Sequence, residues 1–233
     1  MKIITSKTYA IEHGQMDQLE TLYGKVPSGT CAGCTRCCSE SVNMSYVEFL
    51  NVHNHFVGDG SLMKHPDFVN RLIRYYLLEL VQPMKCPFLN ENNLCDVYAF
   101  RPLPCRIFGN TTKAAYESNY KGIRIQNMEV ARQLLHESDL KMPKSVLHKE
   151  IGFCEDYVVN ERLDSASVQK MYDQLVNMDG GLVFKGLLKP TQFNQNLVGW
   201  FIEALLDEID PKVLSRVMLS ELRLEALKAA NLG

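Results

Sequence analysis

Eight cysteines are the residues of this sequence best suited to chemistry, and seven of them fall into two dense groups. The first group fills four of the eight positions in CAGCTRCC, residues 31–38, and the second places three cysteines within residues 86–105. A thiolate can bind a metal, form a disulfide or act as a nucleophile. The candidates are Cys31, Cys34, Cys37, Cys38, Cys86, Cys95, Cys105 and Cys154.

The cellular compartment of the protein determines whether its cysteines are expected to bind metal or to form disulfides. The first 18 residues, MKIITSKTYAIEHGQMDQ, contain no apolar run of the kind found in signal peptides, and no stretch of about 18 apolar residues occurs anywhere. We therefore expect a cytoplasmic protein that does not enter a membrane. Thiols stay reduced in the cytosol, so the cluster favours a metal site, whereas a disulfide framework would require export.

The spacing of the cysteines in the first group favours an iron–sulfur cluster. Cys31, Cys34 and Cys37 form C-x2-C-x2-C, which can direct three sulfurs at one cluster, as in bacterial ferredoxins. The remaining ligand could come from Cys86, which precedes a proline as the remote ferredoxin ligand does. Cys38 departs from that pattern. An adjacent pair suits two metals, or one multinuclear cluster, better than a single zinc ion.

Zinc stays open as the alternative metal. Cys31 and Cys34 with a second close pair would form the closed tetrahedral sulfur site typical of structural zinc. Such sites usually stabilise domains with a small core, and this chain has 233 residues of which 46% are hydrophobic. For Cys154 two interpretations remain, a late metal ligand or a small buried hydrophobic residue.

Charge and motifs exclude several other functions. The formal net charge of −2 gives no electrostatic reason to expect nucleic acid or an anionic membrane as the partner. The sequence contains no P-loop, G-x-G-x-x-G, H-E-x-x-H or G-x-S-x-G motif, so nucleotide-binding, zinc-protease and hydrolase functions lack support.

The elements that must position the cysteines are mostly helices. A capping box at Ser45–Glu48 predicts a helix to about Phe56, and a second helix is expected between Pro66 and about Pro83. The polar turn at residues 90–93 predicts a short hairpin that brings Cys86 and Cys95 together.

The tail is predicted to be helical and free of cysteine. One helix is expected in the body near 126–138, before Cys154; in the tail we expect one from Asp164 through Met178 that ends at Gly180-Gly181, and one over 197–209. A last helix is expected to begin at Asp210-Pro211 and continue through Leu227.

The fold class expected from these elements is mainly α: a single α-rich domain with irregular cysteine-bearing loops and a short β-hairpin around a metal site. Residues 1–160 would form the cysteine-cluster body, and 161–233 a helical C-terminal extension packed on it. The amphipathic C-terminal helices could also form a homodimer surface.

The two cysteine segments together, CAGCTRCC and CPFLNENNLCDVYAFRPLPCRIF, resemble the YkgJ-type cysteine-cluster family. That family is described as a zinc- or iron-chelating domain and has a relative in flagellin lysine N-methylases. The resemblance covers residues 31 to about 110. Seven cysteines match its motif, together with Tyr98, Arg101, Pro102 and Arg106.

The resemblance implies metal binding by those seven cysteines, with Cys154 as a late member of the set. Arg101 and Arg106 would offset the negative charge of the thiolates and donate hydrogen bonds to sulfur. Tyr98 would either direct its hydroxyl at the centre or only pack its ring. Two functions follow: an iron–sulfur protein with a redox role or a role in modifying a protein or peptide substrate, or a zinc-binding scaffold without turnover.

Overall fold

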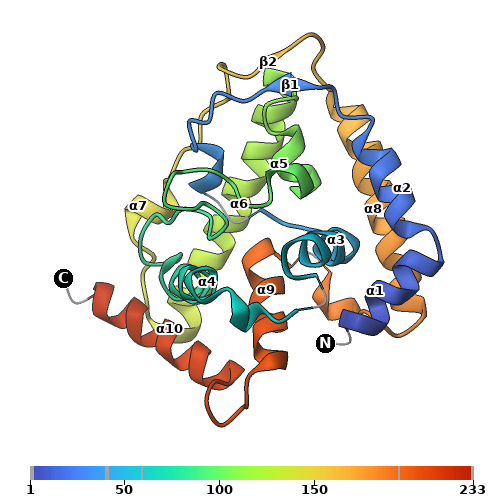
Figure 1. Cartoon of the computed structure of the whole chain (residues 1–233). Helices are drawn as coiled ribbons and strands as arrows, with labels where there is room; N and C mark the ends of the chain where they lie inside the picture. Colours follow the sequence, from blue (N-terminus) through green and yellow to red (C-terminus); the bar gives the residue numbers. More distant parts are fainter. Residues whose placement is uncertain (1–2, 40–41, 59, 194, 232–233) are drawn as a thin grey trace.

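The computed structural model describes residues 3–39, 42–58, 60–193 and 195–231, and its architecture is mainly helical (Figure 1). One two-stranded antiparallel sheet accompanies the helices in these ranges. The expected fold class, an α-rich single domain with little β structure, is confirmed. Within the same ranges, no helix is both long enough and apolar enough to cross a bilayer.

Local signals set the limits of the helices in the first part of the chain. The hydroxyl of Ser45 accepts the backbone N–H of Glu48 at 3.4 Å and Oε2 of Glu48 accepts the N–H of Ser45 at 3.2 Å, so the capping box is confirmed. Pro66 opens the next helix, where its missing N–H costs nothing. These elements are α1 (Ile3–Glu12), α2 (Gln15–Tyr23), β1 (Gly29–Thr30), η1 (Cys37–Ser39), α3 (Tyr46–Val57), η2 (Leu62–Lys64) and α4 (Pro66–Leu78).

Most of the later part of the chain is also helical. α9 and α10 both contact α4, and α8 lies beside α2 along one side of the molecule (Figure 1). These elements are η3 (Tyr98–Phe100), α5 (Leu103–Ile107), α6 (Lys113–Ser138), α7 (Lys144–Leu147), β2 (Val158–Val159), α8 (Ser165–Phe184), η4 (Pro190–Gln192), α9 (Leu197–Glu208) and α10 (Arg216–Asn231).

Aromatic side chains form the centre of the core and hold the second cysteine segment. Phe49 of α3 and Phe88 both pack edge-on against Phe201 of α9, with ring centroids 5.2 and 5.0 Å apart. Such pairs add about 0.5–1.5 kcal/mol to the stabilisation from burial. Phe88 is 0% exposed and follows Cys86 by two residues, so the core fixes the start of the cysteine hairpin.

The predicted end of α8 at Gly180-Gly181 is wrong, because the helix continues to Phe184. A side chain at Gly181 would place its Cβ 3.3 Å from Nε2 of Gln15, which itself donates to the carbonyl of Met178 at 3.0 Å. The glycine therefore permits close packing of α2 on α8 and does not end the helix.

Two further helix starts differ from prediction. α10 begins at Arg216, because Asp210 organises a turn first: its carboxylate accepts the N–H of Lys212 at 2.9 Å and its carbonyl that of Val213 at 2.8 Å. α6 begins at Lys113 after a Thr112 cap, earlier than the predicted 126.

The small sheet joins the loop before Cys31 to the loop after Cys154. Gly29 pairs with Val159 and Thr30 with Val158. An added Cβ at Gly29 would lie 2.3 Å from the Tyr157 ring, so this approach requires glycine. The predicted 86–95 hairpin is confirmed as an antiparallel bridge between Leu89 and Cys95.

Candidate metal centre

The first cysteine segment is a tight loop that closes in a short 3₁₀ turn. Gly33 and Thr35 adopt left-handed backbone conformations, with φ values of 69° and 55°. The N–H of Cys38 then donates to the carbonyl of Thr35 at 3.2 Å. This turn places the sulfur atoms of Cys37 and Cys38 4.0 Å apart.

The second cysteine segment is hydrogen-bonded directly to the first. The N–H of Cys86 donates to the carbonyl of Cys38 at 2.6 Å. Cys86 and Cys95 both pack against the hydrophobic core, and the side-chain oxygen of Asn90 stabilises the turn between them by accepting the N–H of Leu94 at 3.1 Å. Two cysteines distant in sequence from the loop are thereby anchored beside it.

Cys105 lies on α5, which a buried glutamate anchors. Oε1 of Glu48 accepts the N–H of Leu103 at 2.5 Å and the hydroxyl of Tyr23 at 2.9 Å. Glu48 is 0% exposed, and burial raises its pKa, partly offset by these hydrogen bonds. One carboxylate therefore connects α2, α3 and α5 and sets the position of Cys105.

Five thiols from the three segments form what we call the inner group: Cys37, Cys38, Cys86, Cys95 and Cys105. Burial raises the pKa of Cys86 to about 12 and the pKa of Cys105 well above its usual value, and the neighbouring thiols raise both further. The pKa of Cys37 is lowered, chiefly because Cys38 donates a hydrogen bond to it. Several thiolates are costly at this place unless cations accompany them.

Arg101 and Lys85 supply positive charge beside the inner group. Burial raises the pKa values of Cys37, Cys95 and Cys105, and the charge of Arg101 lowers all three by a smaller amount. Within the described part of the chain, Nε of Arg101 is buried and has no hydrogen-bond partner. Lys85 Nζ donates to the carbonyl of Thr35 at 3.0 Å.

The contacts of Tyr98 and Arg106 are with guanidinium, backbone and aromatic groups of the protein. The Tyr98 ring is 46% exposed and lies 4.1 Å from Cζ of Arg101. Nε of Arg106 donates to the carbonyl of Arg101 at 2.7 Å, and its guanidinium lies 4.0 Å from the centre of the Tyr23 ring. Both contacts give these residues a role in supporting the 98–106 segment.

The remaining thiols, Cys31, Cys34 and Cys154, form what we call the outer group. Arg36 connects its parts: Nε donates to Cys34 Sγ at 3.5 Å, and the guanidinium forms an ion pair with Asp156. Hydrogen bonds from the backbone and side chain of Arg36 lower the pKa of Cys34. Burial, followed by the nearby thiols of Cys34, Cys37 and Cys31, raises the pKa of Cys154.

Three residues near the thiols were not predicted. Arg36 was detectable, because it lies inside the CTRCC motif. Lys85 directly precedes Cys86, yet its bond to the first loop is a tertiary contact. Glu48 was identified only as a capping residue, and its bond to Leu103 becomes visible only once the chain has folded.

The donor set fits a thiophilic metal, although its sulfurs are not arranged around one point. All eight thiols are free. Among the residues of the described ranges, no three Cys, His, Asp or Glu side chains converge tightly enough to hold an ion. Rotation of thiol side chains between staggered positions would therefore have to accompany binding. A set of sulfur ligands beside a guanidinium N–H that has no hydrogen-bond partner in the described ranges suits either a zinc ion or an iron–sulfur cluster.

Comparison with known proteins identifies the cysteine segment. Residues 30–124 match the family model CxxCxxCC, described as "Putative zinc- or iron-chelating domain". No curated protein and no solved structure matches the chain. The matched residues include seven of the eight cysteines and exclude Cys154. Residues 30–124 are thus similar to the CxxCxxCC family, and this match supports metal binding by the chain.

Proposed function

We propose that this protein holds an iron–sulfur cluster between thiols of the inner group. The observation that carries the proposal is that five free thiols from three separate segments lie close enough to raise one another's pKa, and two of them pack against the core. Five thiols exceed the four that a single tetrahedral zinc ion binds. Most iron–sulfur clusters are held by cysteine thiolates, so the donor set suits them.

The cations beside the inner group support the same proposal. Thiolates leave net negative charge on a cluster, and hydrogen bonds to sulfur tune its potential. The Arg101 guanidinium has an unpartnered N–H within the described ranges and lowers the pKa of the neighbouring thiols. When bound, the cluster would supply electron transfer or a reactive iron site. Arg101 would hold charge beside it and donate a hydrogen bond.

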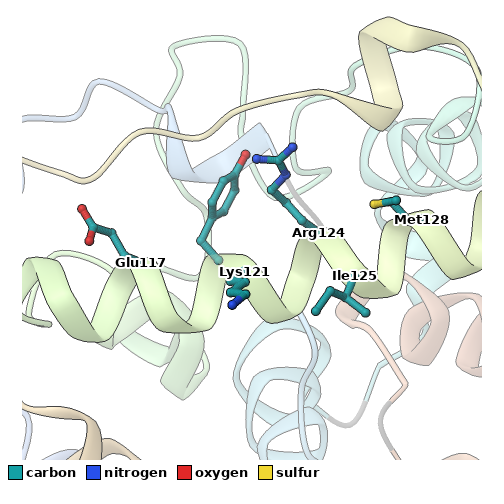
Figure 2. Close-up of a pocket in the computed structure, with 6 residues that line it drawn as sticks. Glu117, Lys121, Arg124, Ile125 and Met128 are labelled. Atoms are coloured by element: carbon teal, nitrogen blue, oxygen red, sulfur yellow. The ribbon is translucent and has the colours of Figure 1, made fainter.

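A groove along α6 supports the second part of the proposal, a protein or peptide substrate. The groove has a volume of about 370 Å³ and is open on one side. Its lining combines charges of both signs with apolar side chains, including Glu117, Lys121, Arg124, Ile125 and Met128 (Figure 2). All of its lining residues lie on α6, and such a shallow mixed surface suits a peptide better than a small apolar ligand, which requires an enclosed pocket.

A zinc-binding scaffold is the second candidate, and one distance favours it. Two sulfurs bound to one tetrahedral zinc at about 2.3 Å lie about 3.8 Å apart. The sulfurs of Cys37 and Cys38 are 4.0 Å apart, so this adjacent pair could share one ion after a small movement.

Anaerobic purification followed by metal analysis separates the two candidates. We expect brown protein that contains iron and acid-labile sulfide in equal amounts, with visible absorption that dithionite bleaches. Cys86→Ala should remove the colour of the inner cluster, whereas Glu129→Ala, a change on the exposed surface of α6 outside the groove, should leave it unchanged. Colourless protein with stoichiometric zinc would establish the scaffold function, and a chain without metal would refute both candidates.

A further inference from the structure

We infer that Cys154 completes a second metal site with Cys31, Cys34 and Cys37, which leaves Cys38, Cys86, Cys95 and Cys105 of the inner group for the first site. The inference rests on the proposed function, because it assigns ligands within the same metal-binding region. Cys154 lies outside residues 30–124, so the family match does not assign it. The ligand expected is a thiophilic metal, either zinc or iron, held by four thiolates.

Residues 149–159, which we call the strap, bring Cys154 to the first cysteine loop. The strap ends in β2, and Thr30 pairs with Val158 in the small sheet. Cys31 follows the paired Thr30 directly, while Cys154 precedes Val158 by four residues. The sheet thus aligns the beginning of the cysteine loop with the end of the strap (Figure 1).

A second connection crosses between the loop and the strap beside the thiols themselves. Arg36 forms an ion pair with Asp156 and donates to the sulfur of Cys34. Asp156 lies two residues after Cys154. The guanidinium of Arg36 therefore contacts the thiol of Cys34 and a residue close to Cys154. The same cation offsets part of the charge of four thiolates.

α6 holds the other end of the strap. The hydroxyls of Tyr116 and Tyr120 donate to carbonyls at Ile151 and Lys149, the second at 3.1 Å. The ring of Phe153 packs on Tyr116 with centroids 5.7 Å apart. The ammonium of Lys149 donates to the carbonyl of Ser39, at the end of the cysteine loop. The strap is therefore anchored on both sides of Cys154.

In this arrangement the adjacent cysteines Cys37 and Cys38 belong to two different metal sites. Cys37 completes the C-x2-C-x2-C spacing of the outer thiols. Cys38 is hydrogen-bonded through its carbonyl to the N–H of Cys86, which belongs to the inner group. Two four-thiolate sets follow: Cys31, Cys34, Cys37 and Cys154 outside, and Cys38, Cys86, Cys95 and Cys105 inside.

Alkylation of the anaerobically purified wild-type protein tests this assignment without any variant. Iodoacetamide should leave Cys154 unmodified, together with Cys31 and Cys34, and should label all three after a chelator has removed the metal. Mass spectrometry of tryptic peptides gives the extent of labelling at each site. Cys34 is exposed and the other two are partly exposed, so burial alone cannot protect them.

Metal content of Cys154→Ser provides the second measurement, with Glu155→Gln on the strap as the matched control. We expect Cys154→Ser to lose the metal of the outer site while the inner site stays occupied, and to expose Cys31 and Cys34 to alkylation, while the control keeps both properties of the wild type. Full metal content in Cys154→Ser, with Cys31 and Cys34 still protected, would overturn the inference and leave the proposed function standing. Wild-type protein that binds no metal would overturn the proposed function itself.

Discussion

At the scale of single residues, Glu48 has the most demanding environment. It is fully buried and accepts hydrogen bonds from Tyr23, Ser45 and Leu103. We predict that Glu48→Ala lowers the free energy of unfolding by about 3 kcal/mol, because it leaves buried donors without an acceptor. Urea unfolding measures the change. Glu117→Ala on exposed α6 is the control, and an equal effect of both substitutions would contradict the assigned role of Glu48.

His53 is predicted to make the stability of the folded protein depend on pH. The ring is 7% exposed, and neither ring nitrogen has a hydrogen-bond partner among the described residues. Burial lowers its pKa to about 4, whereas an unfolded histidine titrates near 6.5. Between these values the unfolded chain binds more protons, so stability contributed by neutral His53 is lost as pH falls from about 6.5 to about 4.

The variant His53→Leu should remove that contribution. We expect the difference in urea midpoint between wild type and His53→Leu to be constant above about pH 7 and to move in favour of the variant below about pH 6. Unfolding curves recorded at several pH values measure it. A difference that does not change with pH would show that His53 does not titrate as its burial implies.

At the scale of elements, a residue of α8 that is distant in sequence caps the N-terminus of α3. The two carboxylate oxygens of Asp179 accept the N–H groups of Tyr46 and Val47 at 2.7 and 2.9 Å. We predict that Asp179→Ala costs about 2 kcal/mol of stability, because two buried donors lose their acceptor. Asp164→Ala is the matched control, since Asp164 caps α8 at the exposed surface and should cost about 1 kcal/mol. The reverse order of the two effects would refute the cross-helix cap.

The sequence predicts those elements whose signals are local. The capping box at Ser45, the proline at the start of α4 and the Asn90 turn each depend on residues within a few positions, and all three predictions are confirmed. The end of α8 was mispredicted because Gly181 serves the packing of α2, a contact with a residue more than 160 positions away. The same difference applies to the site. The cysteine motif is local, whereas the pairing of Thr30 with Val158 beside Cys154 is visible only after folding.

At the scale of the whole molecule, metal binding and folding should be coupled. A ligand that binds only the folded chain raises its stability, and thiolate sites are absent from the unfolded chain. We predict that removal of metal by a chelator lowers the midpoint of thermal unfolding, and that the loops at 31–39 and 86–105 lose protection from hydrogen exchange first. Circular dichroism and exchange mass spectrometry measure these changes. An unchanged midpoint would show that the thiols do not connect the three segments through metal.

The homodimer expected through the C-terminal helices stays a prediction. α10 exposes Val217, Met218 and Leu222 on its surface, and these are the residues that a second copy would cover. Sedimentation velocity of wild type and Leu222→Arg tests this directly. We expect a dimer for the wild type and a monomer for the variant, and two identical monomeric profiles would exclude this interface.

The distance along the chain between the outer thiols has a consequence for the order of events during translation. About 120 residues separate Cys34 from Cys154, whereas every inner thiol has been synthesised by residue 105. At about 5–20 residues per second, the ribosome needs roughly 6–24 s to make that intervening stretch. During this interval Cys31 and Cys34 have no partner from the strap, while the inner set can already assemble. In the proposed assignment the nascent chain presents oxidisable thiols before the strap that would cover them is made, so we expect its maturation to depend on reductants in the compartment where it is made.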